Sequence, residues 1–233
     1  MTIQIKQAKP ARGVVGQIVG QMARLATATF AQRMLSGDMK LISNTIDATV
    51  FIVDIHDVAN CLNESEPLEA VRKLDIFYAN IQQMVHENGG IVTQCGEDSI
   101  VTIFCSPEQQ QKDDAQRAIA VAYEVMAQLV LLNKWRLAHK LRPVHIGLGV
   151  NSGDMIVDNK CDKKRRQLTI QGEAVDIAAK FSFLNRRTPV HTIFLGHNTV
   201  QGIQNQNGWL IEPLRADVEV GQTAVSVYAL MLP

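Results

Sequence analysis

The chain has 233 residues, a formal net charge of zero and 46% hydrophobic residues. That length and hydrophobic content suit one generous domain, or one domain with an extension, built around a sizeable core. A neutral chain has no global electrostatic attraction for nucleic acid or for an anionic membrane, so neither is expected as a partner.

The cysteines and the apolar runs indicate a cytoplasmic setting. The four cysteines are widely spaced and form no CxxC pair, which argues against a zinc site and against a disulfide framework. No secretory signal peptide is seen at the N-terminus. The longest apolar run, "AIAVAYEVMAQLVLL", contains Glu124 and Gln128, so we interpret it as a buried helix rather than a membrane span.

The first part of the chain differs from the rest. Residues 1–11 are polar and basic, and the apolar residues from Val14 to Met34 follow a roughly helical spacing that ends at Gly37. We interpret residues 1–39 as a basic tail and helical arm, and residues 40–233 as the main domain. The arm is either a signal-transducing or dimerising segment of a larger architecture, or a plain packing helix. Association with a membrane is expected only through such a larger architecture.

The main domain begins with a strand, a helix and a hairpin. The segment "ATVFIVDI" (48–55) predicts a buried strand that ends in an acid, and residues 66–90 predict a helix that two glycines stop. The segment "IVTQCGEDSIVTIF" (91–104) predicts a hairpin with its turn at residues 96–98. Residues 113–135 predict a second helix.

The remaining elements complete an α+β pattern. Residues 144–157 predict a pair of strands, residues 161–167 a basic loop and residues 172–187 a helix, and two more strands are predicted at 192–196 and 223–231. The order strand, helix, strand, strand, helix, strand is that of a ferredoxin-like βαββαβ core, here with C-terminal additions. Many unrelated functions use that fold, so it does not fix the function.

Two acids lie at strand ends that this fold makes neighbours. Asp54 ends the first strand, and Asp98 lies in the turn between the second and third. Two carboxylates that face one way from adjacent strand ends can hold two hard divalent cations, which can clamp the oxygens of a phosphoryl transfer. The alternative is a pair of solvated turn acids, but an acid that ends a wholly apolar strand is unexpected there.

Several segments, taken in order, resemble one family. They are "RMLSGDMKLISNTIDATVFIVDI", "NGGIVTQCGEDSIVTIF", "DDAQRAIAVA", "GLGVNSGDMIV" and "QLTIQGEAVDIAAKF". Over about residues 33–231 the chain resembles the class III nucleotidyl cyclase catalytic domain, the adenylate/guanylate cyclase homology domain. No single segment matches perfectly, but their order and spacing together are quite specific.

The resemblance implies a two-metal reaction. It places Asp54, Ile55 and Asp98 at the site of two Mg²⁺ or Mn²⁺ ions, where a ribose 3′-hydroxyl attacks the α-phosphorus of a nucleoside triphosphate and pyrophosphate leaves. Backbone amides of residues 55–59, among them Asp57, Val58 and Ala59, are expected to cradle the phosphates. In this family the site lies across a head-to-tail dimer, so a homodimer is the expected assembly.

The resemblance also assigns the base contacts. The base-selecting lysine of adenylate cyclases falls on Gln94, and its acidic or threonine partner falls on Thr169. Gln94 has both a donor and an acceptor, so it can still read a base edge without specifying adenine. ATP is the expected triphosphate, and a guanine or pyrimidine preference is left open.

Other positions depart from the family pattern. The family's ribose-positioning asparagine falls on Asp176, and its transition-state arginine falls on Lys180, which keeps the charge but loses the planar two-pronged donor. Asp176 and Lys180 are four residues apart on a predicted helix, so an ordinary ion pair between them is an equal alternative. The phosphate-loop glycine falls on Asp57, whose charge opposes phosphate, and the glycine before the second metal aspartate falls on Glu97.

Two further features have both a functional and a simpler interpretation. The basic residues 163–166 are either a clamp on the triphosphate or a solvated loop, and we favour the loop. His56, beside Asp54, either perturbs the metal site or is a surface histidine, and we favour the surface residue.

Four hypotheses therefore stay open. The chain is an active cyclase, or a degenerate cyclase domain that serves as a nucleotide- or metal-binding regulatory or dimerising module. A third hypothesis joins these, with this chain supplying the metal half of a heterodimer. The fourth is a ferredoxin-like protein without nucleotide chemistry, which the order of the motifs disfavours.

Overall fold

The structure is a computed structural model of the 233-residue chain. It describes residues 45–56, 58, 67–106, 113–162, 165–184, 192–203, 208–214, 217–220 and 223–231. The predicted arm at residues 1–39, and Asp57 and Ala59 of the predicted phosphate loop, lie outside the described residues.

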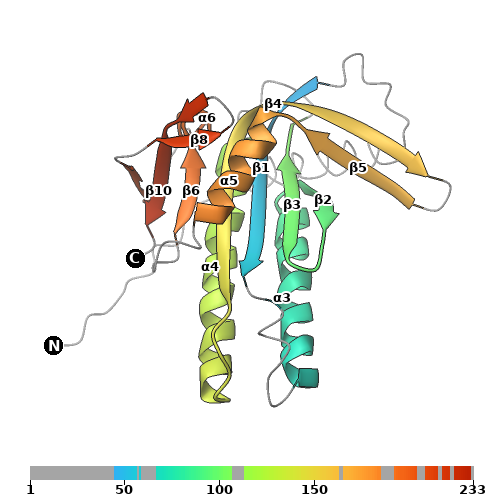
Figure 1. The fold of residues 1–233 in the computed structure, drawn as a ribbon, viewed down its shortest axis with the longest axis vertical. Coiled ribbons are helices and arrows are strands. Elements are labelled where there is room, and N and C mark those ends of the chain that lie inside the picture. Colours follow the sequence, from blue (N-terminus) through green and yellow to red (C-terminus); the bar gives the residue numbers. More distant parts are fainter. Residues whose placement is uncertain are drawn as a thin grey trace, which may run out of the picture.

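The centre of the fold is the expected βαββαβ unit (Figure 1). Its elements are β1 (Thr45–His56), α3 (Pro67–Glu87), β2 (Gly90–Cys95), β3 (Ser99–Phe104), α4 (Asp114–Ala138) and β4 (His145–Asp162). The sheet has the order β2-β3-β1-β4-β6-β10-β7, and β5 pairs with β4. Strands β1 and β3 are therefore central neighbours, as the ferredoxin-like pattern predicts.

The C-terminal additions extend the sheet beyond β4. They are β5 (Arg165–Gln171), α5 (Glu173–Leu184), β6 (Ile193–Gly196), α6 (His197–Gln201), β7 (Leu210–Pro213), β8 (Val218–Val220), β9 (Thr223–Val225) and β10 (Val227–Met231). Strand β6 pairs with β4 in parallel, and β10 joins β6 to the edge strand β7. Strands β8 and β9 form a separate hairpin.

The alternation of side chains along β1 divides the core into two clusters. Phe51, Val53 and Ile55 belong to the cluster formed with α3 and α4. Val50 and Ile52 belong to a second cluster, which includes residues of β5 and α5. Helices α3 and α4 therefore cover one face of the sheet and α5 covers the other (Figure 1).

Helix α4 has the length and hydropathy of a membrane span, but one side of it builds the core. Half of its most apolar window is buried inside the protein, and Val121, Val125 and Leu129 belong to the cluster between the sheet and the two helices. The interpretation of this run as a buried helix is confirmed.

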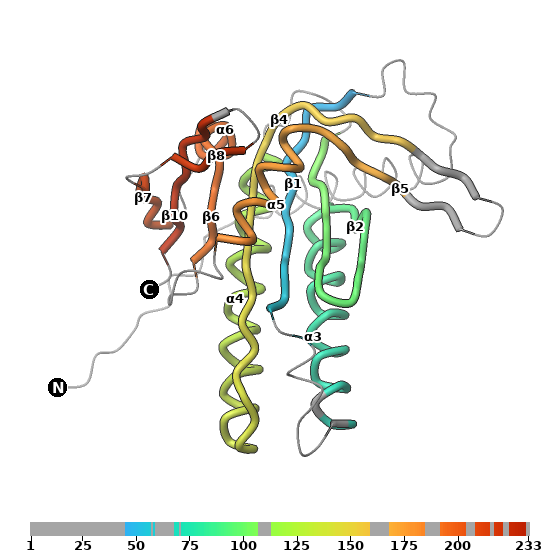
Figure 2. The backbone as a smooth tube through the Cα atoms, viewed as in Figure 1, coloured from blue at the N-terminus to red at the C-terminus, as the bar shows by residue number. Residues whose placement is uncertain are grey.

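Two sequence interpretations are wrong in the same region. The predicted strand pair at 144–157 is instead one continuous strand from His145 onward, β4, in which Gly153 stays in register opposite Ala48. The predicted basic loop at 161–167 is largely strand, since Cys161 pairs with Arg166 and Asp162 with Arg165. The result is a two-stranded arm that runs beyond β1 (Figure 2).

Candidate functional site

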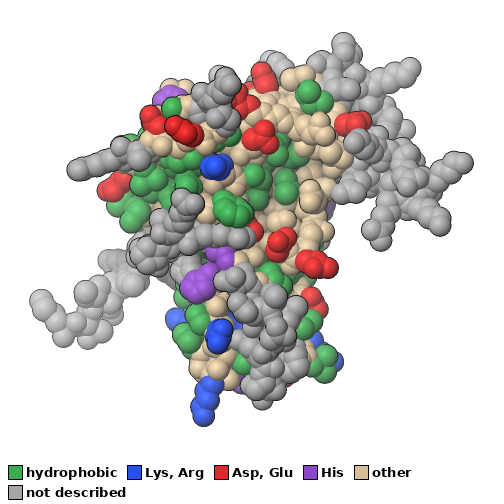
Figure 3. Space-filling view, viewed as in Figure 1, with side chains coloured by type: hydrophobic (Ala, Val, Ile, Leu, Met, Phe, Trp, Pro, Cys, Tyr) green, Lys and Arg blue, Asp and Glu red, His purple; other side chains and the backbone are tan. Residues whose placement is uncertain are grey.

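The two candidate metal acids lie at the same end of two neighbouring central strands, β1 and β3. Asp54 pairs with Ser99 of β3 on one side and with Gly147 of β4 on the other. The backbone amide of Ile55 donates a 2.6 Å hydrogen bond to the carbonyl oxygen of Asp98 in the turn of the β2–β3 hairpin. The structure therefore brings the Asp54 strand end and the Asp98 turn into direct contact. Figure 3, in the same view as Figure 1, shows several acidic side chains in red near the middle of the molecule.

The hairpin that carries Asp98 is held from two sides. Within the turn, the amide of Gly96 donates to the carbonyl of Ser99 at 2.8 Å. From helix α3, the Tyr78 hydroxyl donates to the carbonyl of Glu97 at 2.6 Å. The Asp98 side chain is exposed, so the fixed backbone presents a solvent-facing carboxylate beside the end of β1.

The Asp54 carboxylate lies under helix α5. Its position alternates with Ile55, so it faces away from α3 and α4, and it is only 7% exposed. On the neighbouring strand, a Cβ at Gly147 would lie 1.8 Å from the Ser182 carbonyl oxygen, and one at Gly149 would lie 2.1 Å from that of Ala178. Only glycine at these two positions lets α5 lie this close to the sheet.

His56 is buried, so its interpretation as a surface histidine is wrong. It is 7% exposed, because it follows Asp54 on the same face of β1 and α5 covers that face. Its Nε2 atom is 3.5 Å from Oδ2 of Asp54. This Nε2 is buried and, within the residues that the structure describes, has no hydrogen-bond partner.

The donors at this edge fit a hard divalent cation. Carboxylates of Asp54 and Asp98 and a backbone carbonyl at Ile55 are oxygen ligands of the kind that Mg²⁺ and Mn²⁺ take, with water or phosphate oxygens completing the shell. No group of three or more His, Cys, Asp or Glu side chains able to hold a metal occurs within the described part of the chain. A metal here would therefore rest on two carboxylates, as the sequence predicts.

The two candidate base-contact residues lie on neighbouring elements. Gln94 is exposed near the end of β2, beside an irregularity in the β2–β3 register between Val92 and Gln94. Thr169 is partly buried in β5 and pairs with Asp158 of β4. Leu168 and Ile91 share a buried cluster, which places β5 against β2.

Asp176 and Lys180 are both exposed on helix α5. The packed face of this helix consists of Ala174, Ile177, Ala178, Phe181 and Ser182. No ion pair joins Asp176 to Lys180 among the described residues, although they are one helical turn apart. Their side chains are thus available to a group that docks on α5.

The remaining predicted contacts are described only in part. Val58 is helical, and its partly buried side chain packs against the core cluster of β1, α3 and α4. Arg165 and Arg166 of the basic segment lie in β5, and residues 163 and 164 fall outside the described part.

A polar cavity lies at the opposite end of β1 from Asp54. Its volume is about 600 Å³, and its lining includes Thr49, Asp114 and Ser152. It contains none of the predicted site residues. Thr49 and Ser152 share a 2.8 Å hydrogen bond across β1 and β4.

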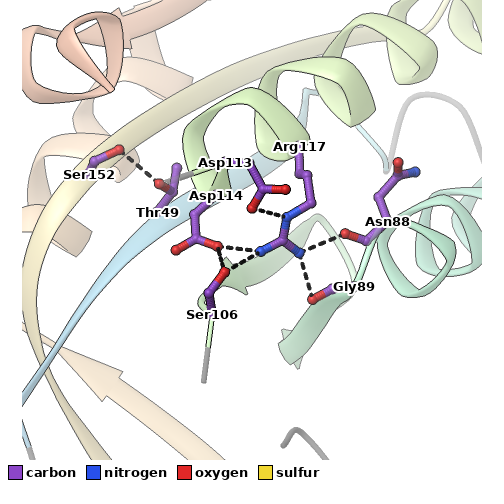
Figure 4. A network of polar contacts seen from close by, with 8 residues as sticks. All are labelled: Thr49, Asn88, Gly89, Ser106, Asp113, Asp114, Arg117 and Ser152. Atoms are coloured by element: carbon purple, nitrogen blue, oxygen red, sulfur yellow. Dashed lines mark hydrogen bonds and ion pairs between the residues drawn. The ribbon is translucent and has the colours of Figure 1, made fainter. Parts of the chain in front are cut away.

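Beside this cavity, Arg117 joins three elements (Figure 4). It pairs with Asp113 and Asp114 at the start of α4, and it donates to the carbonyls of Asn88 and Gly89 after α3. Ser106 after β3 donates to Asp114 at 2.8 Å. Burial raises the pKa of the Asp114 carboxyl, and this outweighs the opposite effect of Arg117. Sequence inspection did not single out this network.

Solved structures with a similar fold come from nucleotide cyclases. The adenylyl cyclase CyaB from P. aeruginosa superposes with a TM-score of 0.68 at 22% identity, covering 81% of this chain and 96% of that one. The guanylate cyclase domain of RhGC from Catenaria anguillulae, solved in complex with GTP, gives a TM-score of 0.64 at 17% identity, covering 79% and 96%. At such low sequence identity, these superpositions establish the fold alone.

Sequence comparisons reach the same family. An uncharacterized protein of Mycobacterium tuberculosis is 25% identical over 189 residues, which are 81% of this chain and 32% of that protein. Adenylate cyclase 1 of Rhizobium meliloti is 24% identical over 140 residues, 60% of this chain and 21% of that protein. The chain thus spans no more than a third of these two relatives. The model of the adenylate and guanylate cyclase catalytic domain matches residues 42–230, and the chain belongs to that family.

Proposed function

We propose that this domain converts a nucleoside triphosphate, with ATP as the expected substrate, to a 3′,5′-cyclic nucleotide and pyrophosphate. The observation that supports the proposal is the main-chain contact between the end of β1, which carries Asp54, and the hairpin turn, which carries Asp98. The family supports the reaction class, and the donor set supports two Mg²⁺ or Mn²⁺ ions as cofactors.

Asp54, Asp98 and the Ile55 carbonyl would hold these ions. Bound there, the ions supply Lewis-acid stabilisation of the attacking and leaving oxygens. The chain itself would position the two carboxylates. Asp54 is buried under α5, and hydrogen bonds from Ile55 and Tyr78 hold the hairpin that carries Asp98. Such fixed geometry is the main contribution a protein makes to phosphoryl transfer.

Helix α5 would supply the second group of contacts. Lys180 presents a cation suited to the charge that develops on the triphosphate, and Asp176 one turn earlier can accept a hydrogen bond from a ribose hydroxyl. Asp176 also repels phosphate, so the pair is a weaker arrangement than the asparagine and arginine of the family pattern.

A second chain completes the site in this proposal. Gly147, opposite Asp54, and Asp158, opposite Thr169, lie on the same strand. The separation of eleven residue positions corresponds to about 36 Å along an extended strand. Thr169 is thus far from Asp54 along β4, and in the proposed head-to-tail homodimer the metal acids of one chain would face the base contacts of the other.

The first test is a product assay. The purified protein is incubated with Mn²⁺ or Mg²⁺ and each of ATP, GTP, CTP and UTP, and cyclic nucleotides are detected by mass spectrometry. We expect a product that Asp54→Asn abolishes. Absence of product with every triphosphate, in a folded dimeric protein, would contradict the proposal.

A mixing experiment tests the shared site. Asp54→Asn and Lys180→Ala impair opposite halves, so each variant alone is inactive. In an equal mixture half of the dimers are mixed, and each mixed dimer has one intact site, so about a quarter of the wild-type activity should return. No recovery after verified exchange of subunits would show that each chain works alone.

The exposed Asp176 favours one second candidate, a regulatory or dimerising domain that binds metal or nucleotide without turnover. A carboxylate in place of the asparagine opposes triphosphate binding. Binding of Mn²⁺ without product would support this candidate. New activity on mixing with another cyclase chain would indicate instead the metal half of a heterodimer.

A further inference from the structure

We propose that His56 is a positioning residue for Asp54, whose buried imidazole fixes the orientation of the carboxylate that binds metal. This inference rests on the proposed metal site. The family resemblance assigns no role to His56, and the sequence alone favours a surface residue there.

The first argument is the location of the ring. His56 and Asp54 lie two residues apart on β1, so they share the face that α5 covers. Nε2 of His56 is 3.5 Å from Oδ2 of Asp54. The ring thus lies against one particular oxygen of the carboxylate, Oδ2, and we expect it to influence which oxygen faces a cation.

The second argument is that no other group in the described part of the chain hydrogen-bonds to this nitrogen. Buried polar atoms in proteins are nearly always hydrogen-bonded, and one without a partner lowers stability. Nε2 of His56 is buried and has no hydrogen-bond partner among the described residues, and His56 as a whole is 7% exposed. Hydrogen bonds in functional sites are often long before the ligand binds and tighten afterwards, so we expect the contact from Nε2 to Oδ2 to shorten into hydrogen-bond range when a cation binds.

The third argument is that the slot for the ring is built by the neighbouring strand. A Cβ at Gly147 would lie 3.1 Å from Nε2 of His56 as well as 1.8 Å from the Ser182 carbonyl oxygen. Glycine at 147 therefore leaves room for both α5 and the imidazole. Hydrogen-bond partners of ligating carboxylates orient the ligand and raise metal affinity, and their loss typically weakens binding 10- to 100-fold.

The test measures Mn²⁺ binding directly, by following free Mn²⁺ with electron paramagnetic resonance as the ion is added. His56→Leu removes the ring nitrogens while keeping an apolar side chain in the slot. We expect the dissociation constant for Mn²⁺ to be roughly 10- to 100-fold larger than that of the wild type. His56→Gln, which keeps an N–H donor of similar reach, should recover part of the loss. His145→Gln is the control, since His145 pairs with His56 across the strands but is exposed.

Unchanged Mn²⁺ affinity in a folded His56→Leu protein would overturn the inference. If that variant does not fold, His56→Gln is compared with the shorter His56→Asn, and equal affinities would overturn it. Pulsed resonance of the wild type separates positioning from ligation: nitrogen coupling of a directly bound imidazole would overturn positioning.

The same titration separates this inference from the proposed function. Equal Mn²⁺ affinity in the wild type and in Asp54→Asn would contradict the proposed metal site itself. If Asp54→Asn loses Mn²⁺ affinity and His56→Leu does not, only the proposed role of His56 is contradicted. In the product assay, His56→Leu should raise the Mn²⁺ concentration needed for half-maximal rate while leaving the rate at saturating Mn²⁺ close to the wild-type value.

Discussion

The amide of Ile55 donates a 2.6 Å hydrogen bond to the carbonyl oxygen of Asp98, which joins the end of one strand to the turn of a hairpin that begins 35 residues later in the chain. This bond fixes the backbone on which both candidate metal acids stand. The relative position of their main-chain segments is thereby fixed, so side chains that brace the hairpin should influence metal binding.

Tyr78→Phe tests this coupling. The variant removes the hydroxyl that donates to the Glu97 carbonyl at 2.6 Å and leaves the ring in place. We expect a few-fold weaker Mn²⁺ affinity and a small loss of thermal stability, because a net hydrogen bond contributes about 1 kcal/mol. The Mn²⁺ titration checks it, with Gln83→Ala on the exposed side of α3 as the control. Equal affinities would show that the hairpin does not need this brace.

Gly147→Ala tests the packing of α5. The added Cβ would meet the Ser182 carbonyl oxygen at 1.8 Å, which forces the helix off the sheet. Overpacking of this kind costs about 1–3 kcal/mol, so the melting temperature should fall by several degrees. Gly96→Ala is the control, since its nearest contact would be 3.5 Å. Similar melting temperatures for both variants would contradict the close approach.

Asp114→Asn tests the buried network beside the polar cavity. Because burial raises the pKa of Asp114 above its ordinary value of 3.8, the folded state binds the proton more tightly than the unfolded state. The contribution of Asp114 to the free energy of unfolding therefore falls as the pH rises from about 3.8 through the raised pKa. Removing the carboxyl should make the variant gain stability relative to the wild type over that interval.

The difference between the two melting curves, recorded from pH 4 to pH 7, isolates this effect from the other carboxyl groups. Arg117 loses its charge partner at position 114 in the variant but keeps Asp113. A difference that stays constant across the interval would mean that Asp114 titrates as it does in the unfolded chain.

Asp176→Asn together with Lys180→Arg tests the outer face of α5. The change removes a carboxylate that repels phosphate and installs a planar two-pronged donor. We expect about a 10-fold or greater gain in product formation, the scale of one well-placed electrostatic group. Both side chains are exposed, so the melting temperature should not change. A drop in rate would show that the native pair is already matched to its substrate.

The central βαββαβ unit could be predicted from the sequence because its periodicities are strong. The apolar run before Asp54 predicted β1, and the glycines around residues 91–104 predicted the hairpin. The juxtaposition of Asp54 and Asp98 followed from the strand order of the fold, and the register confirms that their strands are neighbours.

The features that were missed depend on tertiary packing. Gly153 and Asp154 resemble a turn in sequence, but pairing with β1 keeps them in a long strand. His56 has the polarity of a surface residue, and only α5 buries it. The one signal for that packing was the spacing of Gly147 and Gly149, two small residues on the same face of a strand.

Helix α5 therefore has one face that the fold dictates and one that it does not. The inner face has no spare room, because the carbonyls of Ala178 and Ser182 lie against Gly149 and Gly147. The outer face, with Asp176 and Lys180, carries no packing obligation, so mutations there escape selection for foldability. After a gene duplication, one copy can lose its chemistry at these positions by drift while still folding and docking. A domain built this way is well suited to giving rise to inactive partners of active enzymes.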